Sequence, residues 1–549
     1  MRRLLALLAL LGALSGRLSA QSPDSLLSTV QRLEAAGRWR DAMDPLERYL
    51  AQVPGDVPRL RQMGQYLVWS GDRSRGVAML RRVLTLQPED PTTMAVLGEV
   101  LSWDPASRGE AADLFRRART IEPDNARARE GQANLLAWEG RAGSALPMFD
   151  SLLTGDPASV GALRGKGGAL NQLQRFEEAR VLLARGLAIA PEDPGLRQQM
   201  AQSAIGRERF GEARSFLAGL AGTEEPLRLL QDSTRRALGS FAELRGLYRD
   251  RTEQLDALRG DGGVSLAFGS AWRVTAGYQY SDFSDTAGHF NGSAAGGGLA
   301  FRPDRRFGVE ARALSRQSDG PSPAVWDAGL RARWRPAEAF RITLGFSRDL
   351  VEETRRSVQG VQDADAFRGV VQASVASLGA DLWLAHQRIE LGGRFSAGRN
   401  TGEGLERNDR FSVEASAGYV VRSYRPYLRV GYAHATAGFD YNASEYGARE
   451  PERLGGYFSP FRYYLNYGTV TASHRFSPAV FWEFDARVGG QVTREFEGEN
   501  ADARPAGALN THVTWRAGRA TDLDVRYLYS NTFNAFRLHE VQLLLRQYF

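Results

Sequence analysis

The chain contains no cysteine, and only one of its 70 basic residues, Lys166, is a lysine. Without cysteine there can be no disulfide, no thiolate nucleophile, no cysteine-ligated metal and no lipid-modified N-terminal cysteine. The sequence also lacks any run of 18 apolar residues, which excludes an ordinary transmembrane helix. The formal net charge of +6 is spread over 549 residues without a prominent arginine cluster, so we expect no nucleic-acid partner.

The first twenty residues have the layout of a secretory signal peptide. Arg2 and Arg3 precede an apolar run from Leu4 to Leu14, and small residues before Gln21 offer a cleavage site. The apolar run is too short to span a membrane. The alternative interpretation is a buried N-terminal helix. We expect residues 1–20 to be removed, and the mature protein to act beyond the inner membrane.

Residues 21–250 repeat with a period of 34 or 35. Prolines mark the period at Pro54, Pro88, Pro123, Pro157, Pro191 and Pro226. Small residues follow it in two further series, Gly64, Gly98, Ala133, Gly167, Ala201 and Ala42, Gly76, Ala111, Ala145, Ala179, Ala213. This pattern is typical of the tetratricopeptide repeat, in which small residues let two helices pack closely and a proline follows the second helix. We expect an α-solenoid of six repeats with a degenerate cap after Pro226, and such arrays bind partners.

After about residue 262 the hydrophobic period changes to two. In the segment 340–346, for example, Phe340, Ile342 and Leu344 alternate with polar residues, and 41 of the 54 aromatic residues follow residue 262. A soluble antiparallel sandwich would alternate in the same way. Short connections that alternate with longer polar loops instead favour an outer-membrane barrel. We expect a linker at 251–261 and an antiparallel transmembrane barrel at 262–549, with about 14 strands in a range of 12–16.

The last residue adds to the prediction of a barrel. The final segment, 541–549, alternates and ends on Phe549. A terminal phenylalanine that closes an alternating strand resembles the signal recognised by the barrel-assembly machinery. We therefore expect that machinery, and outer-membrane lipid, to be partners of the chain.

The order of these parts resembles a known group of proteins. A signal peptide, periplasmic tetratricopeptide repeats and a C-terminal barrel are similar to the poly-N-acetylglucosamine export porin, the outer-membrane subunit of cellulose export and the smaller YaiO-type outer-membrane β-barrel family. The segments 66–72, 100–105 and 135–141 look like the helix endings common in that group, although the second carries Pro105 in place of glycine. The resemblance implies an outer-membrane barrel with its repeats in the periplasm, and the size of the barrel favours the YaiO type.

Catalytic chemistry is nearly absent from the sequence. The six histidines are scattered singly over the second half, without metal-ligand spacing. There is no phosphate-binding loop and no Gly-x-Ser-x-Gly motif. We therefore expect no enzyme activity, no catalytic residue, no cofactor and no metal site.

The first candidate site consists of charged residues at the strand positions that alternate with the apolar ones. This set would face the lumen and includes Arg331, Arg333, Arg388, Glu390, Glu483, Asp485, Arg487 and Arg526. These charges can pair with one another and plug the barrel, or they can line a hydrated passage. Their mixed sign disfavours a conduit for one strongly charged ion.

A long aromatic loop and a tryptophan series are the other candidates. The loop at 437–464 carries aromatic residues that can stack on sugars, namely Tyr441, Tyr446, Tyr457, Phe458 and Phe461. The alternative for this loop is an aromatic girdle at the membrane rim. Trp69, Trp103 and Trp138 recur near the ends of the first helices of three repeats. They form either a ladder in the concave groove or part of the packing between repeats.

Two functions remain open from the sequence. One is support of exopolysaccharide export across the outer membrane, with the repeats bound to a periplasmic protein partner. The other is a structural or general diffusion barrel whose repeats recruit envelope proteins.

Overall fold

The computed structural model describes residues 21–222, 224–251, 255–320, 322–362, 367–385, 387–422, 426–444, 450–533 and 536–549. The expected signal peptide lies outside these residues. The chain divides into two compact units, residues 1–169 and 170–549. None of the described helices is both long enough and apolar enough to cross a membrane.

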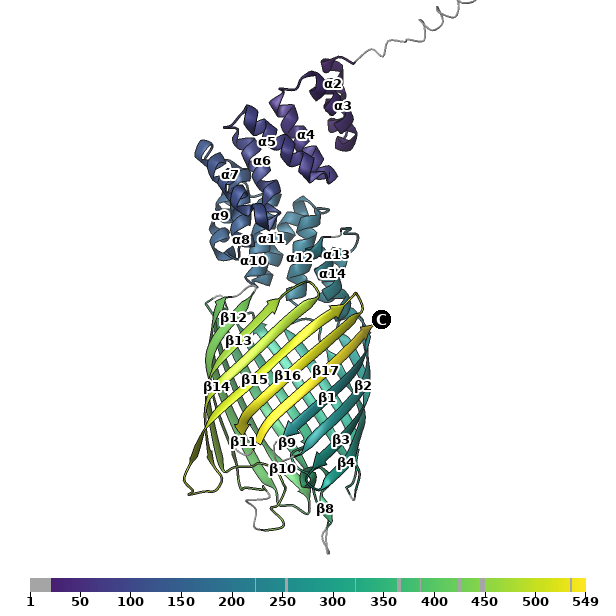
Figure 1. The fold of residues 1–549 in the computed structure, drawn as a ribbon, viewed down its shortest axis with the longest axis vertical. Helices are drawn as coiled ribbons and strands as arrows, with labels where there is room; N and C mark the ends of the chain where they lie inside the picture. Colours follow the sequence, from purple (N-terminus) through teal and green to yellow (C-terminus); the bar gives the residue numbers. More distant parts are fainter. Residues whose placement is uncertain are drawn as a thin grey trace, which may run out of the picture. The chain divides into compact units, whose positions relative to one another are not determined.

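Helices fill the sequence from residue 23 to residue 238 (Figure 1). They are α2 (Pro23–Ala35), α3 (Trp39–Gln52), α4 (Val57–Ser70), α5 (Arg73–Leu86), α6 (Pro91–Ser102), α7 (Arg108–Ile121), α8 (Ala126–Trp138), α9 (Ala142–Gly155), α10 (Val160–Gln172), α11 (Phe176–Ile189), α12 (Pro194–Gly206), α13 (Phe210–Leu217) and α14 (Glu225–Leu238), with a 3-10 turn at Pro105–Ser107. In the first unit α2 packs on α3, α4 on α5, α6 on α7 and α8 on α9. These helical hairpins are the expected tetratricopeptide repeats.

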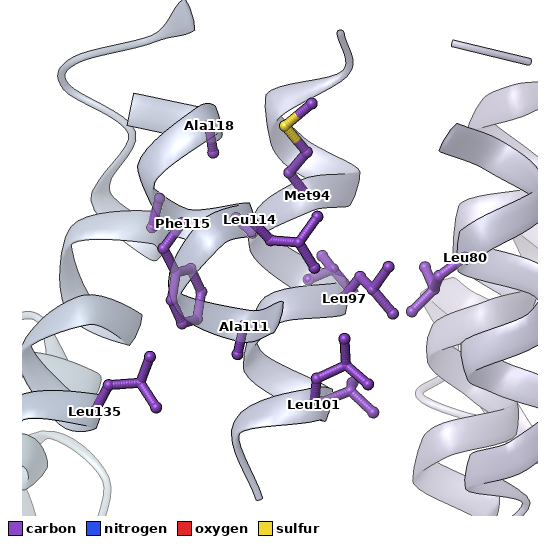
Figure 2. Close-up of a cluster of buried hydrophobic side chains, with 13 residues drawn as sticks. Leu80, Met94, Leu97, Leu101, Ala111, Leu114, Phe115, Ala118 and Leu135 are labelled. Atoms are coloured by element: carbon purple, nitrogen blue, oxygen red, sulfur yellow. The ribbon is translucent and has the colours of Figure 1, made fainter. Parts of the chain in front are cut away.

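The repeat pattern in the sequence has a direct structural reason. Gly98 of α6 faces Phe115 of α7, and a Cβ at residue 98 would lie 2.9 Å from the Phe115 ring. Figure 2 shows Phe115 in a buried cluster with Leu97 and Leu114. Small residues therefore recur because the paired helices approach closely. The prolines from Pro54 to Pro191 follow the second helix of a hairpin, whereas Pro226 lies in the first turn of α14 and begins a helix.

The described strands of the second unit close into a barrel of sixteen antiparallel strands, because β8 (Val361–Gln362) pairs only with β9 among the seventeen strands (Figure 1). The sixteen are β1 (Phe241–Arg251), β2 (Asp256–Phe268), β3 (Trp272–Asp285), β4 (Gly288–Phe301), β5 (Phe307–Ser318), β6 (Val325–Ala337), β7 (Phe340–Leu350), β9 (Phe367–Leu384), β10 (Ile389–Glu403), β11 (Asn408–Arg422), β12 (Tyr427–Phe439), β13 (Arg462–Arg475), β14 (Val480–Arg494), β15 (Asp502–Ala517), β16 (Thr521–Phe533) and β17 (Phe536–Tyr548). β1 pairs with both β2 and β17, so no edge is left open.

The antiparallel barrel is as expected, with sixteen strands at the upper limit of the expected range. The two strands beyond fourteen are β1 and β2. β1 occupies the end of the expected repeat region, and β2 begins in the expected linker at 251–261 and continues into the expected barrel. Alternation is weak in β1 and in the first part of β2, because charged residues and glycines dominate there. Among the described residues from 241 to 262, only Leu244, Tyr248 and Leu258 present large exposed apolar side chains, so the period of two is hard to recognise.

Apolar side chains cover the outer face of the barrel. Leu244 of β1, Trp326 of β6 and Val488 of β14 are 63 %, 63 % and 75 % exposed. Exposed apolar residues at alternate positions on every side of a closed barrel are typical of a lipid-facing surface.

Helices of the second unit contact the short turns at one end of the barrel. The backbone N–H of Arg305 donates to the carbonyl of Arg207 at 2.8 Å, and the Arg305 guanidinium donates to the carbonyl of Gly206 at 3.0 Å. Arg236 of α14 bonds to Asp522 of β16 at 3.1 Å, and both side chains are buried. The last helices, α11–α14, therefore lie against the short-turn end of the barrel.

Candidate functional site: the barrel interior

Three arginines from separate strands identify the inward face of the barrel. Arg249 of β1, Arg259 of β2 and Arg316 of β5 converge on the carboxylate of Glu352, at 3.4, 2.7 and 3.3 Å. Side chains from β1, β2 and β5 can meet at one carboxylate only inside the barrel. Alternate positions on these strands, and their cross-strand partners, therefore also face the lumen.

Residues 351–360, which we call the inner plug, fold into the barrel at the end opposite the short turns. The segment contains the short helix α15 (Arg355–Gln359), with Thr354 as its N-cap. Arg355 binds Asp285 of β3 at 2.8 Å, and the Thr354 hydroxyl donates to the carbonyl of Gly456 at 2.6 Å. The inner plug thus joins the barrel wall to the aromatic loop.

The two glutamates of the inner plug are in opposite electrostatic surroundings. Burial raises the pKa of Glu353, and the backbone N–H of Phe458, which donates to Glu353 at 2.7 Å, offsets this only in part. Burial also acts to raise the pKa of Glu352, but the guanidinium groups of Arg259, Arg316 and Arg249 hold that pKa below its ordinary value. Glu352 is therefore the charged anchor of the plug.

A cavity of about 880 Å³ lies along the wall formed by β3–β7, β9 and β10. Six arginines line it, Arg302, Arg312, Arg331, Arg333, Arg341 and Arg394, together with one carboxylate, Glu310. Glycine, serine and threonine at positions such as Gly329, Thr343 and Ser377 leave the space between them. We call this lining the arginine wall.

Four of the six arginines have a carboxylate partner. Arg302 pairs with Glu310 at 2.5 Å and Arg312 with Asp349 at 2.6 Å. Arg333 pairs with Glu208 at 3.1 Å, and Arg341 with Asp381 at 2.8 Å. Within the described part of the chain, the exposed guanidinium groups of Arg331 and Arg394 have no hydrogen-bond or ion-pair partner.

The other residues expected in the lumen lie in a mixed-charge region. Glu390 pairs with Arg429 at 2.7 Å, Asp485 with Arg487 at 2.8 Å, and Glu483 lies 3.2 Å from the ring of His512. Arg526 donates to the amide oxygen of Asn510 at 2.8 Å. These contacts compensate many of the charged side chains on β10–β16.

Arg388 is in the turn between β9 and β10, not at a lumen position on a strand, and its guanidinium lies 3.5 Å from the Tyr419 hydroxyl. One of the short connections expected from the sequence is the segment 377–381, but β9 runs through it to Leu384. The small residues and the aspartate in 377–381 mimic a turn, although they lie within the strand and Asp381 pairs with Arg341.

The aromatic loop is packed inward over much of its length. Tyr457 is only 4 % exposed, and its hydroxyl accepts a hydrogen bond from the Asn408 amide at 3.1 Å. Burial raises the pKa of Tyr457 to about 12. The ring of Tyr457 is therefore not open for stacking on a sugar, contrary to the expectation for this loop.

The remaining aromatic residues of this loop have different surroundings. Tyr441 lies with Tyr457 around one hydrophobic cluster and donates to the carbonyl of Glu406 at 2.5 Å. Phe458 lies 6.4 Å from Tyr463, and Phe461 lies below the Arg462 guanidinium at 4.1 Å. Tyr446 lies outside the described residues. The loop thus supports the inner plug through its backbone and its buried rings.

The three tryptophans of the first unit are half exposed. Trp69, Trp103 and Trp138 are 54 %, 48 % and 40 % exposed. Arg73 lies over Trp103 and Arg108 over Trp138, both at 5.8 Å, whereas Trp69 packs edge-on against Trp39 at 5.7 Å. Each tryptophan therefore has a free surface beside a packed one.

Sequence reasoning missed the residues that hold the inner plug. Arg249 lies on β1 within the expected repeat region, Arg259 lies on β2 within the expected linker, and Glu352 was not among the expected site residues. The one local signal was the Thr354-x-x-Ser357 spacing, which forms a capping box here. Among the described residues there is no group of three or more histidine or carboxylate side chains that could hold a metal ion.

Two family models match the chain. Residues 136–202 match a tetratricopeptide repeat model, and residues 323–515 match the C-terminus of cellulose synthase operon protein C. The chain is also 25 % identical over 196 residues to cellulose synthase operon protein C of Xanthomonas axonopodis pv. citri (strain 306), which covers 34 % of this chain and 12 % of that protein. The aligned part is thus a small share of that relative's length.

Solved structures of the same two kinds are similar to this chain. A bacterial polysaccharide outer membrane secretin is 15 % identical, with a TM-score of 0.42, over 57 % of this chain and 99 % of that one. A tetratricopeptide repeat protein from Parabacteroides merdae is 15 % identical, with a TM-score of 0.31, over 40 % of this chain and 87 % of that one. The chain combines tetratricopeptide repeats with a barrel similar in sequence to the C-terminus of cellulose synthase operon protein C.

Proposed function

We propose that this protein is an outer-membrane channel that exports a polysaccharide, with its repeats in the periplasm. The observation that carries the proposal is a closed barrel with a lipid-type outer face and a charged, partly hollow interior, whose segment 323–515 matches the C-terminus of cellulose synthase operon protein C. Barrels of this kind have short periplasmic turns and longer outer loops. Contacts of α11–α14 with the short turns support a periplasmic position for the repeats.

The repeats would bring the polymer or a protein partner to the barrel. Half-exposed tryptophans at equivalent positions of three repeats support this role, because an indole face packs well on a sugar ring or on an apolar side chain. The relatives named above are export or repeat proteins, which agrees with a role without catalysis.

A structural barrel is the second candidate, and the inner plug supports it. Glu352 and its three arginines fill the lumen near the outer loops, and a permanently filled lumen would conduct nothing. In this case the repeats alone would carry the function, through recruitment of envelope proteins.

Deletion of the gene distinguishes the two candidates. Under the export proposal, polysaccharide disappears from the medium and accumulates in the periplasm, and expression of the intact protein restores secretion. Secretion at the original level would contradict export. Fractionation of the same strains, with a heat-dependent shift in gel mobility as the mark of a closed barrel, tests the outer-membrane position.

A further inference from the structure

The distribution of charge inside the barrel indicates the chemistry of the polymer. Six arginines and one carboxylate line the cavity of about 880 Å³, whereas a smaller cavity of about 220 Å³ is lined by charges of both signs, including Asp381, Glu414, Arg429 and Asp485. Positive charge therefore predominates in the larger cavity, whereas the smaller cavity is mixed, and Arg394 lines both.

We propose, on the basis of the export function above, that the arginine wall binds an anionic polysaccharide, with carboxylate groups on its sugars. Arg331 of β6 and Arg394 of β10 lie at the cavity without a partner among the described residues, and both are exposed within it. A guanidinium group binds a carboxylate through two parallel hydrogen bonds. These two arginines are the groups whose charge a ligand would neutralise.

The neighbouring arginines would make the site adaptable along a moving chain. Arg302, Arg312 and Arg341 already hold carboxylates at 2.5, 2.6 and 2.8 Å, so a sugar carboxylate can exchange with a protein carboxylate at each of them. Because a protein carboxylate replaces each sugar carboxylate that leaves an arginine, successive sugars can bind and leave without a large change in free energy. The small residues between the arginines, Gly329, Gly345 and Ser377, leave room for the sugar rings.

A neutral or cationic polymer fits this wall poorly. A neutral sugar would leave the charges of Arg331 and Arg394 unneutralised, and amino groups would be repelled by both arginines. The smaller cavity with mixed charge offers no comparable preference. The arginine wall thus selects against two of the three charge classes of polysaccharide.

Binding of three hexasaccharides to the full-length protein in detergent tests the inference. The probes are hexagalacturonate, which is anionic, cellohexaose, which is neutral, and hexaglucosamine, which is cationic. We expect hexagalacturonate to bind at least about tenfold more tightly than cellohexaose, and to weaken strongly between 0.05 and 1 M NaCl because salt screens charge interactions over about 10 Å at 0.1 M and 3 Å at 1 M. Equal affinities for the three probes would overturn the inference.

Variants locate the site within the barrel. The double variant R331Q/R394Q should weaken hexagalacturonate binding about tenfold or more and leave cellohexaose unchanged, since it removes the two charge-assisted contacts to the sugar carboxylates. Arg399→Gln is the matched control, because Arg399 is also on β10 but at a position of the opposite parity, and pairs loosely with Asp409 at 3.9 Å. An unchanged double variant, or an equal loss in the control, would overturn the proposed location.

The result also separates this inference from the export proposal. Tight binding of cellohexaose in place of hexagalacturonate would overturn the anionic class and still support a polysaccharide channel. Absence of binding of all three probes, together with normal polysaccharide secretion after gene deletion, would contradict both.

Discussion

Arg259 on β2 donates to both carboxylate oxygens of Glu352, at 2.8 and 2.7 Å. This bidentate contact ties the inner plug to the wall of the barrel. Two further arginines surround the same carboxylate, so its negative charge is compensated from three strands. Under the export proposal, passage through the lumen requires release of this anchor.

Glu352→Gln is expected to loosen the inner plug. The substitution keeps the shape of the side chain but removes the shared charge at which Arg249, Arg259 and Arg316 meet, so three largely buried guanidinium groups are less well compensated. We expect more frequent opening in single-channel conductance recordings of the full-length protein. Glu353→Gln is the matched control, because the raised pKa of Glu353 already favours the neutral form. A higher open probability in the control alone would contradict the role of Glu352 as anchor.

The inner plug should be most stable at mildly acidic pH. The raised pKa of Glu353 means that its contribution to the closed state is complete below about 4.3, the ordinary pKa of glutamate, and is lost as the pH rises through the raised value. The lowered pKa of Glu352 has the opposite effect. The contribution of Glu352 to the closed state is present above about 4.3 and is lost as the pH falls through the lowered value. Conductance recorded across pH should therefore have a minimum near pH 4.3 and rise on both sides of it. A pH-independent conductance would count against this linkage.

Arg236→Ala should destabilise the contact of α14 with the barrel. Arg236 and Asp522 are 8 % and 9 % exposed, and removal of one member of a buried pair leaves an uncompensated charge that costs about 3–5 kcal/mol. The apolar double variant R236M/D522L should cost less. The measurement is the temperature at which the folded barrel loses its distinct gel mobility. Equal losses in the single and double variants would show that the ion pair is not the cause.

The three tryptophans should contribute little to stability and much to binding. Trp103→Ala and Trp138→Ala replace half-exposed side chains, so we expect changes well below the roughly 3–5 kcal/mol of a buried tryptophan. Trp69→Ala should cost somewhat more, because Trp69 also packs against Trp39 and Tyr66. Thermal unfolding and oligosaccharide or partner binding are measured together. Loss of the folded repeats in all three variants would show that these tryptophans act as core residues and not as a binding surface.

The repeats should be soluble without the barrel if the cut precedes β1. A fragment of residues 21–239 ends before Phe241, whereas one that ends at Asp250 keeps most of a strand with Leu244 and Tyr248 exposed and no partner strand. An unpaired apolar strand promotes aggregation. Size-exclusion chromatography and circular dichroism should show a helical monomer for the shorter fragment and aggregates for the longer one. A disordered shorter fragment would mean that the repeats depend on the barrel.

The fold could be predicted where a regular pattern is repeated many times. The close approach of Gly98 to Phe115 has a counterpart between Gly64 and Leu80 in the preceding hairpin, and small residues recur at this position, so the period of 34 or 35 is visible in the sequence. The lipid-facing alternation of β7 and its neighbours is equally clear, because lipid requires an apolar residue at every second position. β1 and the first part of β2 were not predicted as strands, because Gly246, Gly260 and Gly262 replace apolar residues in them.

The interior of the barrel could be predicted only in part. Parity placed Arg331 and Arg333 on the lumen side of β6, since side-chain direction follows from the period of two. Parity does not determine which charges meet across the lumen, so the convergence of Arg249, Arg259 and Arg316 on Glu352 was not visible. The inward fold of the inner plug depends on contacts more than 90 residues apart, such as Thr354 with Gly456. No local pattern encodes such contacts.

A reversible lock on the inner plug tests most directly whether a polysaccharide passes through this lumen. The Thr354 hydroxyl donates to the carbonyl of Gly456 at 2.6 Å, and a Cβ at residue 456 would lie 2.6 Å from that hydroxyl, so the variant T354C/G456C places two cysteines side by side. The φ of Gly456 is +70°, so any side chain there strains the backbone, and the single variant G456C is the control for that strain. The absence of native cysteine leaves no competing pair. With the disulfide formed, the account predicts that polysaccharide stays in the periplasm, and that a reductant restores secretion to the level of the single variant G456C. Undiminished secretion with the disulfide fully formed would contradict the account.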